Sequence, residues 1–140
     1  MHGKKKKVLF ICTHNAARSQ MAEGLLNAFL SDRYEAYSAG TEPSQVNPYA
    51  IKAMAEIGID ISKNRSKSLE EFREKKINDV VTVCDQAKGA CPFFAGAGTY
   101  LHQSFDDPSQ FQGTEDEVLA KVREVRNEIR AWIEETFSRK

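Results

Sequence analysis

Short runs of apolar and β-branched residues alternate along the chain with segments in which apolar residues recur every three or four positions. The runs predict four strands, at residues 8–12, 34–39, 79–84 and 99–105. The first run, Val8-Leu9-Phe10-Ile11-Cys12, is apolar throughout, which is typical of a strand buried on both faces of a parallel sheet.

The segments with helical spacing predict helices between and after these strands. The first apolar face consists of Ala17, Met21, Leu25, Ala28 and Phe29. A second helix is expected to begin with Asn47 as its N-cap and Pro48 as its first residue, and to end near Gly58.

Two further helices complete the pattern. A short one is expected over residues 68–75, and a long one begins at Thr114, which forms a capping box with Glu117. Its apolar stripe consists of Val118, Val122, Val125, Ile129 and Trp132. The alternation of strands and helices predicts an α/β fold, with a parallel sheet and helices on both faces.

Composition narrows the class of protein. The 140 residues suit a single domain over residues 1–140, and 41% hydrophobic with 29% charged residues is an ordinary globular balance. Twenty basic and twenty acidic side chains cancel, so a general nucleic-acid or membrane-surface binder is not expected. The apolar run after residues 4–7 is too short for a secretory signal, and no segment approaches a membrane span, which favours a cytoplasmic location. Three cysteines are too few for a disulfide scaffold.

The first cysteine stands where chemistry is expected. Cys12 ends the first strand directly before a helix, and Arg18 follows after five residues, Thr13-His14-Asn15-Ala16-Ala17. Backbone N–H groups of such a turn and the guanidinium of Arg18 suit an oxyanion, and the same positive charge favours the thiolate form of cysteine. Ser19 is expected to donate a hydrogen bond to this thiolate, and Asn15 tolerates the left-handed backbone of such a loop.

Residues 12–20, with Met21-Ala22-Glu23-Gly24 after them, resemble the anion-binding loop of the low-molecular-weight protein tyrosine phosphatase fold. Further segments are similar to that group in the same order, at residues 38–40, 47–48, 58–61 and 105–108. The resemblance implies a four-stranded parallel sheet in the order 2-1-3-4 with helices on both faces. Within the fold, Cys84 and Cys91 make the chain most similar to the thioredoxin-coupled arsenate reductases.

This resemblance implies reduction of arsenate to arsenite by three cysteines in turn. Cys12 would attack arsenate, Cys84 would attack Cys12 and expel arsenite, and Cys91 would carry the disulfide outward for reduction by thioredoxin. The implied sheet order puts the strand of Cys84 beside that of Cys12, and the spacing of adjacent strands, about 4.8 Å, is compatible with a disulfide. Asp107 matches the general acid of the family, which protonates the leaving oxygen. The expected partners are arsenate and thioredoxin, and the protein is expected to be a monomer with no cofactor or metal.

Two other functions stay open. A tyrosine phosphatase would form a phosphocysteine on Cys12, but Ser109 stands where phosphatases of this fold usually carry tyrosine, and Cys84 and Cys91 would have no role. A non-enzymatic sensor would bind arsenite or a soft metal through the three thiolates, but it would not need Arg18.

The loop departs from the family pattern at two positions. His14 stands where a glycine is common, and Ala17 where many relatives have another cysteine. Some thioredoxin-coupled members bind an alkali cation through positions that match Asn15, Glu23, Ser38 and an aspartate. That last position is Lys67 here, and we expect its ammonium to replace the ion.

Overall fold

Four parallel strands form one sheet in the order β2-β1-β3-β4 in the computed structural model, which describes residues 5–83 and 97–137. The strands are β1 (Lys6–Cys12), β2 (Tyr34–Gly40), β3 (Asp79–Thr82) and β4 (Thr99–His102). Side chains 8–11 of β1 are completely buried, as its uninterrupted apolar run predicts. The predicted α/β fold and sheet order are confirmed.

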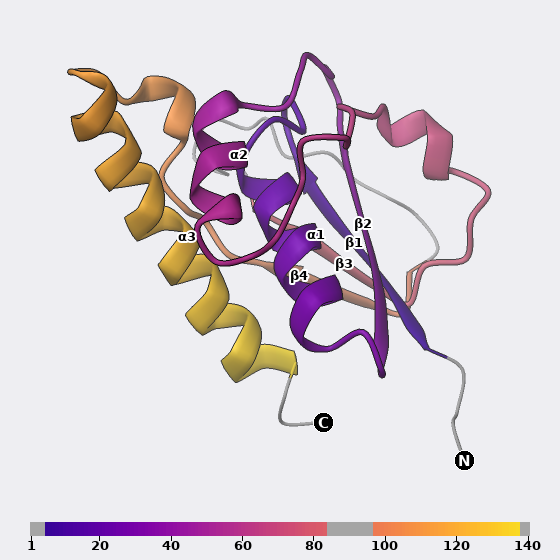
Figure 1. The fold of residues 1–140 in the computed structure, drawn as a ribbon. Helices are drawn as coiled ribbons and strands as arrows, with labels where there is room; N and C mark the ends of the chain where they lie inside the picture. The colour runs from indigo at the N-terminus through magenta and orange to yellow at the C-terminus, as the bar shows by residue number, and fades with distance from the viewer. Residues whose placement is uncertain (1–4, 84–96, 138–140) are drawn as a thin grey trace.

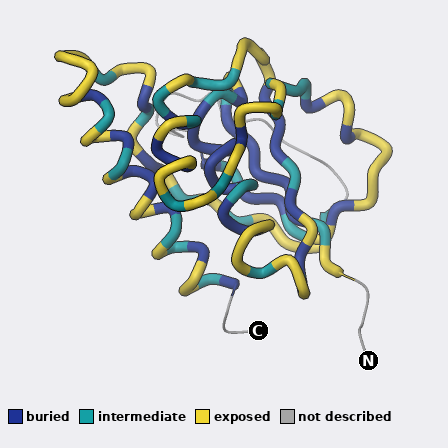
Figure 2. Tube along the Cα trace, in the orientation of Figure 1, coloured by how far each residue is buried: buried dark blue, intermediate teal, exposed yellow. Residues whose placement is uncertain are grey.

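Three α-helices lie on one face of the sheet, as Figure 1 shows: α1 (Arg18–Phe29), α2 (Pro48–Ala55) and α3 (Glu115–Phe137). They share one apolar core with Val8 and Phe10 of β1. Successive side chains of a strand point to opposite faces of the sheet, so Leu9 and Ile11 lie on the other face. There they form a second cluster with the short 3-10 helix η1 (Leu69–Phe72). Figure 2 shows the resulting arrangement, with buried strands at the centre and exposed segments around them.

The predicted helix starts are confirmed in their hydrogen bonds. The Asn47 side chain accepts from the N–H of Tyr49 at 2.8 Å and caps α2. At the start of α3, Glu117 accepts from the N–H of Thr114 at 2.8 Å, and Thr114 accepts from the N–H of Glu117 at 3.1 Å. This is the reciprocal capping box that the sequence indicates.

Some predicted bounds and buried positions differ from the structure; the third strand, for example, ends at Thr82. The expected helix over residues 68–75 is only the single turn η1, because just Leu69 and Phe72 find apolar contacts and the residues after them are charged. The fourth strand ends at His102 instead of residue 105, where the chain turns toward the end of β1. In α3, Trp132 is half-buried, while Ile133 and Phe137 continue the buried stripe.

Among the described residues, no helix combines the length and the apolar character that a bilayer crossing requires.

Candidate active site

The loop between β1 and α1 begins at Cys12 and curls around the N-terminus of α1. Asn15 has φ +52°, the left-handed conformation expected for it, and its side chain is fully buried. Arg18 is the first residue of α1, so the loop passes directly into the helix end where N–H groups lack intrahelical acceptors.

Neighbouring segments hold the carbonyl oxygens of this loop. Those of Thr13, His14 and Ala16 accept from the N–H groups of Glu42 (2.8 Å), Ser44 (3.3 Å) and Asn47 (2.8 Å). The two other carbonyls, at positions 15 and 17, are also hydrogen-bonded. Within the described part of the chain, no acceptor is seen for the N–H groups of residues 13–17. The backbone donors therefore remain available to an anion.

The end of β2 lies against this loop so closely that only glycine fits there. A Cβ atom built on Gly40 would lie 2.5 Å from the carbonyl oxygen of Thr13 and 2.9 Å from the nitrogen of Asn15. The N–H of Gly40 donates to the carbonyl oxygen of Lys67 at 2.9 Å, so the residue is held from the opposite side as well. Gly40 thus fixes the distance between the two segments.

A chain of buried hydrogen bonds leads from the sulfur of Cys12 into the protein. The hydroxyl of Ser19 lies 2.9 Å from Cys12 Sγ and accepts from Asn15 Nδ2 at 2.8 Å. Because Asn15 already supplies a hydrogen to this oxygen, the hydroxyl hydrogen of Ser19 is free to point at the sulfur. This is the contact between Ser19 and the sulfur of Cys12 that the sequence predicts. Gln20 Nε2 in turn donates to the carbonyl and the side-chain oxygen of Asn15, at 3.2 Å and 3.0 Å.

The guanidinium of Arg18 is buried between the ends of β3 and β4. Its Nη1 donates to the carbonyl oxygens of Val83 (3.4 Å) and Phe105 (3.3 Å), and its Nη2 lies 3.5 Å from Asp107 Oδ2. The other carboxylate oxygen of Asp107 accepts from the N–H and the hydroxyl of Ser109, at 3.0 Å and 2.9 Å. The chain that follows β4 therefore presents a carboxylate directly to the loop arginine.

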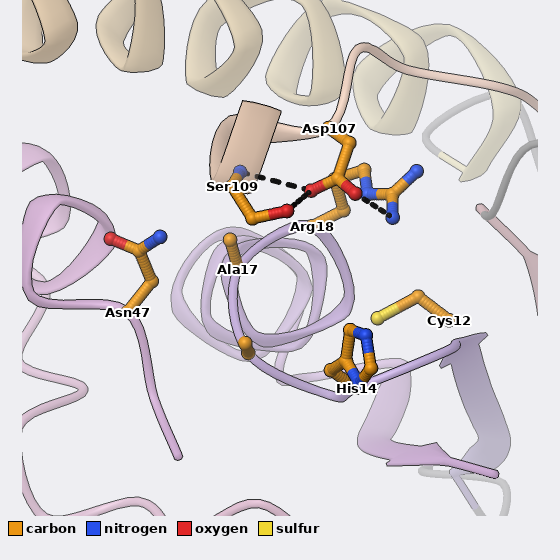
Figure 3. Close-up of a pocket in the computed structure, with 8 residues that line it drawn as sticks. Cys12, His14, Ala17, Arg18, Asn47, Asp107 and Ser109 are labelled. Atoms are coloured by element: carbon orange, nitrogen blue, oxygen red, sulfur yellow. Dashed lines mark hydrogen bonds and ion pairs between the residues drawn. The ribbon is translucent and has the colours of Figure 1, made fainter. Parts of the chain in front are cut away.

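These groups surround one narrow cavity with a volume of about 20 Å³, which suits a small group (Figure 3). Of the predicted site residues, Cys12, His14, Ala16, Ala17, Arg18 and Asp107 line it. Thr13, Asn15 and Ser19 belong to its supporting shell through the hydrogen bonds above. The two other predicted cysteines, Cys84 and Cys91, lie outside the described residues.

Lys67 stands beside the loop where the sequence hypothesis requires a positive charge. Its Nζ lies 3.8 Å from Glu23 Oε1 and donates to the carbonyl oxygen of Arg65 at 3.1 Å. Ser38 donates to the same oxygen of Glu23. Burial raises the pKa of the Glu23 carboxyl above its ordinary value of 4.5, and Lys67 acts in the opposite direction. An ammonium thus lies beside Glu23, as the hypothesis of a replaced cation requires, and the replacement itself stays a prediction.

Several supporting residues could not be expected from the sequence. Ser66 donates to the carbonyl oxygen of Asn15 at 2.9 Å, and the N–H of Lys67 donates to its side chain at 2.8 Å. Asn64 donates to Gln20 Oε1 at 3.0 Å. The only signal was that Gln20 is a polar residue in the first turn of a buried helix, and two of its partners, Asn64 and the carbonyl of Arg65, are more than forty positions away in the chain.

The fold and the loop define a class of protein, and the sequence comparison agrees. The sequence profile described as low molecular weight phosphotyrosine protein phosphatase matches residues 7–139. The chain therefore belongs to the low molecular weight phosphotyrosine protein phosphatase family.

Close relatives within this class are arsenate reductases. An arsenate reductase of Halalkalibacterium halodurans is 46% identical over 125 residues, which cover 89% of this chain and 90% of the relative. A solved structure described as an arsenate reductase in the phosphate binding state superimposes with a TM-score of 0.82 at 30% identity, and the match covers 96% of this chain and 98% of the other. A thioredoxin-dependent arsenate reductase of Corynebacterium glutamicum gives a TM-score of 0.65 at 26% identity, covering 97% of this chain and 65% of the other.

Proposed function

We propose that the protein is an arsenate reductase that works through a relay of three cysteines and is regenerated by thioredoxin. Cys12 is the residue that meets the substrate, at the base of the cavity that Arg18 and the loop backbone make positive. The expected arsenate substrate is a small tetrahedral oxyanion, in keeping with the narrow cavity. The similarity to relatives with that activity supports the same assignment.

A contact between β1 and the residue that follows β3 supports the proposed relay. The N–H of Val83 donates to the carbonyl oxygen of Ile11 at 2.9 Å. Val83 directly precedes Cys84 in the chain, and Ile11 directly precedes Cys12. A disulfide requires Cα atoms about 4.4–6.8 Å apart, and the proposed relay requires Cys12 and Cys84 to come within that distance.

The chemistry follows in three exchanges. The thiolate of Cys12 attacks arsenic(V), an As–O bond breaks, and the oxygen leaves as water. Cys84 then attacks the sulfur of Cys12, and the S–As bond breaks with its electron pair moving to arsenic, which departs as arsenite. Cys91 attacks Cys84 and frees the Cys12 thiolate, and the dithiol of thioredoxin reduces the resulting Cys84–Cys91 disulfide.

Asp107 supplies the proton for the leaving oxygen in this scheme. In the structure its carboxylate faces Nη2 of Arg18 at 3.5 Å. An arriving oxyanion competes for that guanidinium with two oxygens of its own and displaces Asp107 from it. The carboxyl group then stands beside the bound substrate, as a general acid must.

A coupled assay tests the proposal: arsenate-dependent oxidation of NADPH in the presence of thioredoxin and thioredoxin reductase. We expect turnover with arsenate and little hydrolysis of p-nitrophenyl phosphate under the same conditions. Phosphatase turnover without arsenate reduction would instead assign the protein to the phosphatase activity for which the family is named.

Cysteine variants separate the steps of the relay. Cys84→Ser should retain arsenate binding and lose multiple turnover, and Cys91→Ser should accumulate a Cys12–Cys84 disulfide that mass spectrometry identifies. If Cys84→Ser reduced arsenate at the wild-type rate, the relay would be wrong. A thiol sensor would bind arsenite in every one of these assays without turnover.

The cellular compartment and the oligomeric state follow from the same chemistry. Thiol exchange with thioredoxin requires a compartment that keeps cysteines reduced, so we expect the protein to act in the cytoplasm. A relay contained in one chain needs no second subunit, and we expect a monomer in size-exclusion chromatography.

A further inference from the structure

His14 lines the cavity together with Cys12 and Arg18, yet the proposed relay gives it no task. His14 is exposed, and in Figure 3 it lies near Cys12, on the side of the loop away from Asp107 and Ser109.

One hydrogen bond decides which nitrogen of the ring carries a hydrogen. His14 Nδ1 lies 2.9 Å from the carbonyl oxygen of Glu42. A carbonyl oxygen can only accept, so Nδ1 must be the donor, and in the neutral ring Nε2 is left as a bare acceptor. The remaining residues that line the cavity include donors for an anion, chiefly Arg18, and Asp107 as an acceptor that is already held by Ser109.

We infer that Nε2 of His14 accepts a hydrogen bond from the hydroxyl group of the substrate oxyanion and thereby selects hydrogen arsenate. This inference rests on the proposed function, because it names the form of the substrate that the same site prefers. At mildly alkaline pH the arsenate and phosphate dianions each carry one hydroxyl. The sulfate dianion has the same shape and charge but no hydroxyl, and the dianion of an aryl phosphate has none either.

A site that hydrogen-bonds a substrate hydroxyl disfavours analogues without it, because the acceptor is then left facing an oxygen lone pair. The backbone N–H groups and Arg18 do not make this distinction, since they donate equally to any of these anions. His14 is thus a specificity-determining residue that distinguishes a free hydrogen oxyanion from sulfate and from aryl esters.

Direct binding of inorganic phosphate and sulfate tests this without any turnover. Titration calorimetry at mildly alkaline pH should show that the wild-type protein binds phosphate about tenfold more tightly than sulfate, the contribution of one neutral hydrogen bond. His14→Asn can still donate to the Glu42 carbonyl but lacks the acceptor at the position of Nε2. It should bind the two anions with similar affinity. His14→Gln places an amide oxygen near that position and should restore part of the preference.

Two further variants make the result specific. His102→Asn removes an exposed imidazole that does not line this cavity and should leave the preference unchanged. Asp107→Asn tests the carboxylate that lines the cavity, and the preference should survive it. Equal binding of phosphate and sulfate by the wild-type protein, or a preference that His14→Asn keeps and Asp107→Asn loses, would overturn the inference.

The two proposals fail separately. A protein that prefers phosphate to sulfate through His14 but does not reduce arsenate contradicts the proposed function alone. A protein that reduces arsenate while His14→Asn leaves the anion preference intact contradicts only the assignment of His14.

Discussion

Replacing Gly40 with alanine tests whether the close packing of β2 against the loop creates the anion site. The added Cβ would lie 2.5 Å from the Thr13 carbonyl oxygen, roughly 1 Å inside van der Waals contact. Neither the backbone at Gly40 nor that at Thr13 can move away without losing a hydrogen bond. The Thr13 carbonyl is bonded to the N–H of Glu42, and the N–H of Gly40 is bonded to the carbonyl of Lys67.

The expected effect has two parts. Overpacking of a buried contact costs about 1–3 kcal/mol, so the free energy of unfolding of Gly40→Ala should fall by that amount. Relief of the clash must displace the loop by a distance of the order of 1 Å, and a displacement of that size costs about 100-fold in rate when it misaligns reacting groups. We therefore expect kcat/KM for arsenate to fall by about two orders of magnitude.

Gly58→Ala is the matched control. Gly58 has φ +82°, so alanine there is strained by about 1–2 kcal/mol, but no atom lies within 4 Å of the added Cβ. Both variants should unfold at lower denaturant concentrations than the wild type, and only Gly40→Ala should lose activity and phosphate affinity. The assays are urea unfolding, the coupled arsenate assay and phosphate titration.

Two results would refute this reasoning. If Gly40→Ala keeps at least half of the wild-type kcat/KM, the contact with Thr13 does not determine the shape of the loop. If Gly58→Ala loses as much activity as Gly40→Ala, the loss follows from lower stability and not from the geometry of the site.

The remaining predictions concern the groups beneath the loop. Ser19→Ala removes the hydroxyl that faces the sulfur of Cys12. Because a donor to a charged group contributes about 1.5–3 kcal/mol, kcat/KM should fall at least tenfold and alkylation of Cys12 by iodoacetamide should slow. An unchanged alkylation rate would contradict the contact. Burial raises the pKa of Glu23 in the folded protein, so the stability that Glu23 contributes declines as the pH rises from about 4.5 through that raised value. Relative to wild type, Glu23→Gln should therefore be most destabilised near pH 4.5 and less so at higher pH in urea unfolding. A loss of unfolding free energy that grows with pH would show that the pKa of Glu23 is lowered in the folded protein and not raised. Because Lys67 already lies beside Glu23, added potassium should change kcat/KM by less than about twofold. A large stimulation by potassium would show that the ammonium of Lys67 does not take the place of an alkali cation.

The order of elements and the centre of the site were predictable from local patterns. The uninterrupted apolar run before Cys12 indicates a strand buried on both faces, and Asn47 and Thr114 predict the starts of α2 and α3 through hydrogen bonds within a few residues. Cys12 and Arg18 lie within one strand, loop and helix, so their spacing, together with the strand before it and the helix after it, indicates an anion site.

Boundaries and supporting contacts were not predictable in the same way. Residues 99–105 have the composition of a strand to their end, but β4 stops at His102. After it the chain turns toward the loop, where the carbonyl of Phe105 accepts from Arg18 and the carboxylate of Asp107 faces the same guanidinium. Contacts of this kind join positions nearly ninety residues apart and leave no periodicity in the sequence.

The sequence by itself therefore determined the layers of the fold and the proposed nucleophile with its arginine, because strand burial, helix capping and a loop motif are encoded by neighbouring residues. Only the tertiary structure decided how tightly that loop is held and what it faces. The fit of Gly40 against Thr13, the pairing of Lys67 with Glu23 and the contact of His14 with the Glu42 carbonyl all depend on segments that meet through folding. Whether a side chain donates, accepts or clashes depends on its partner, and the tertiary fold determines which residue that partner is.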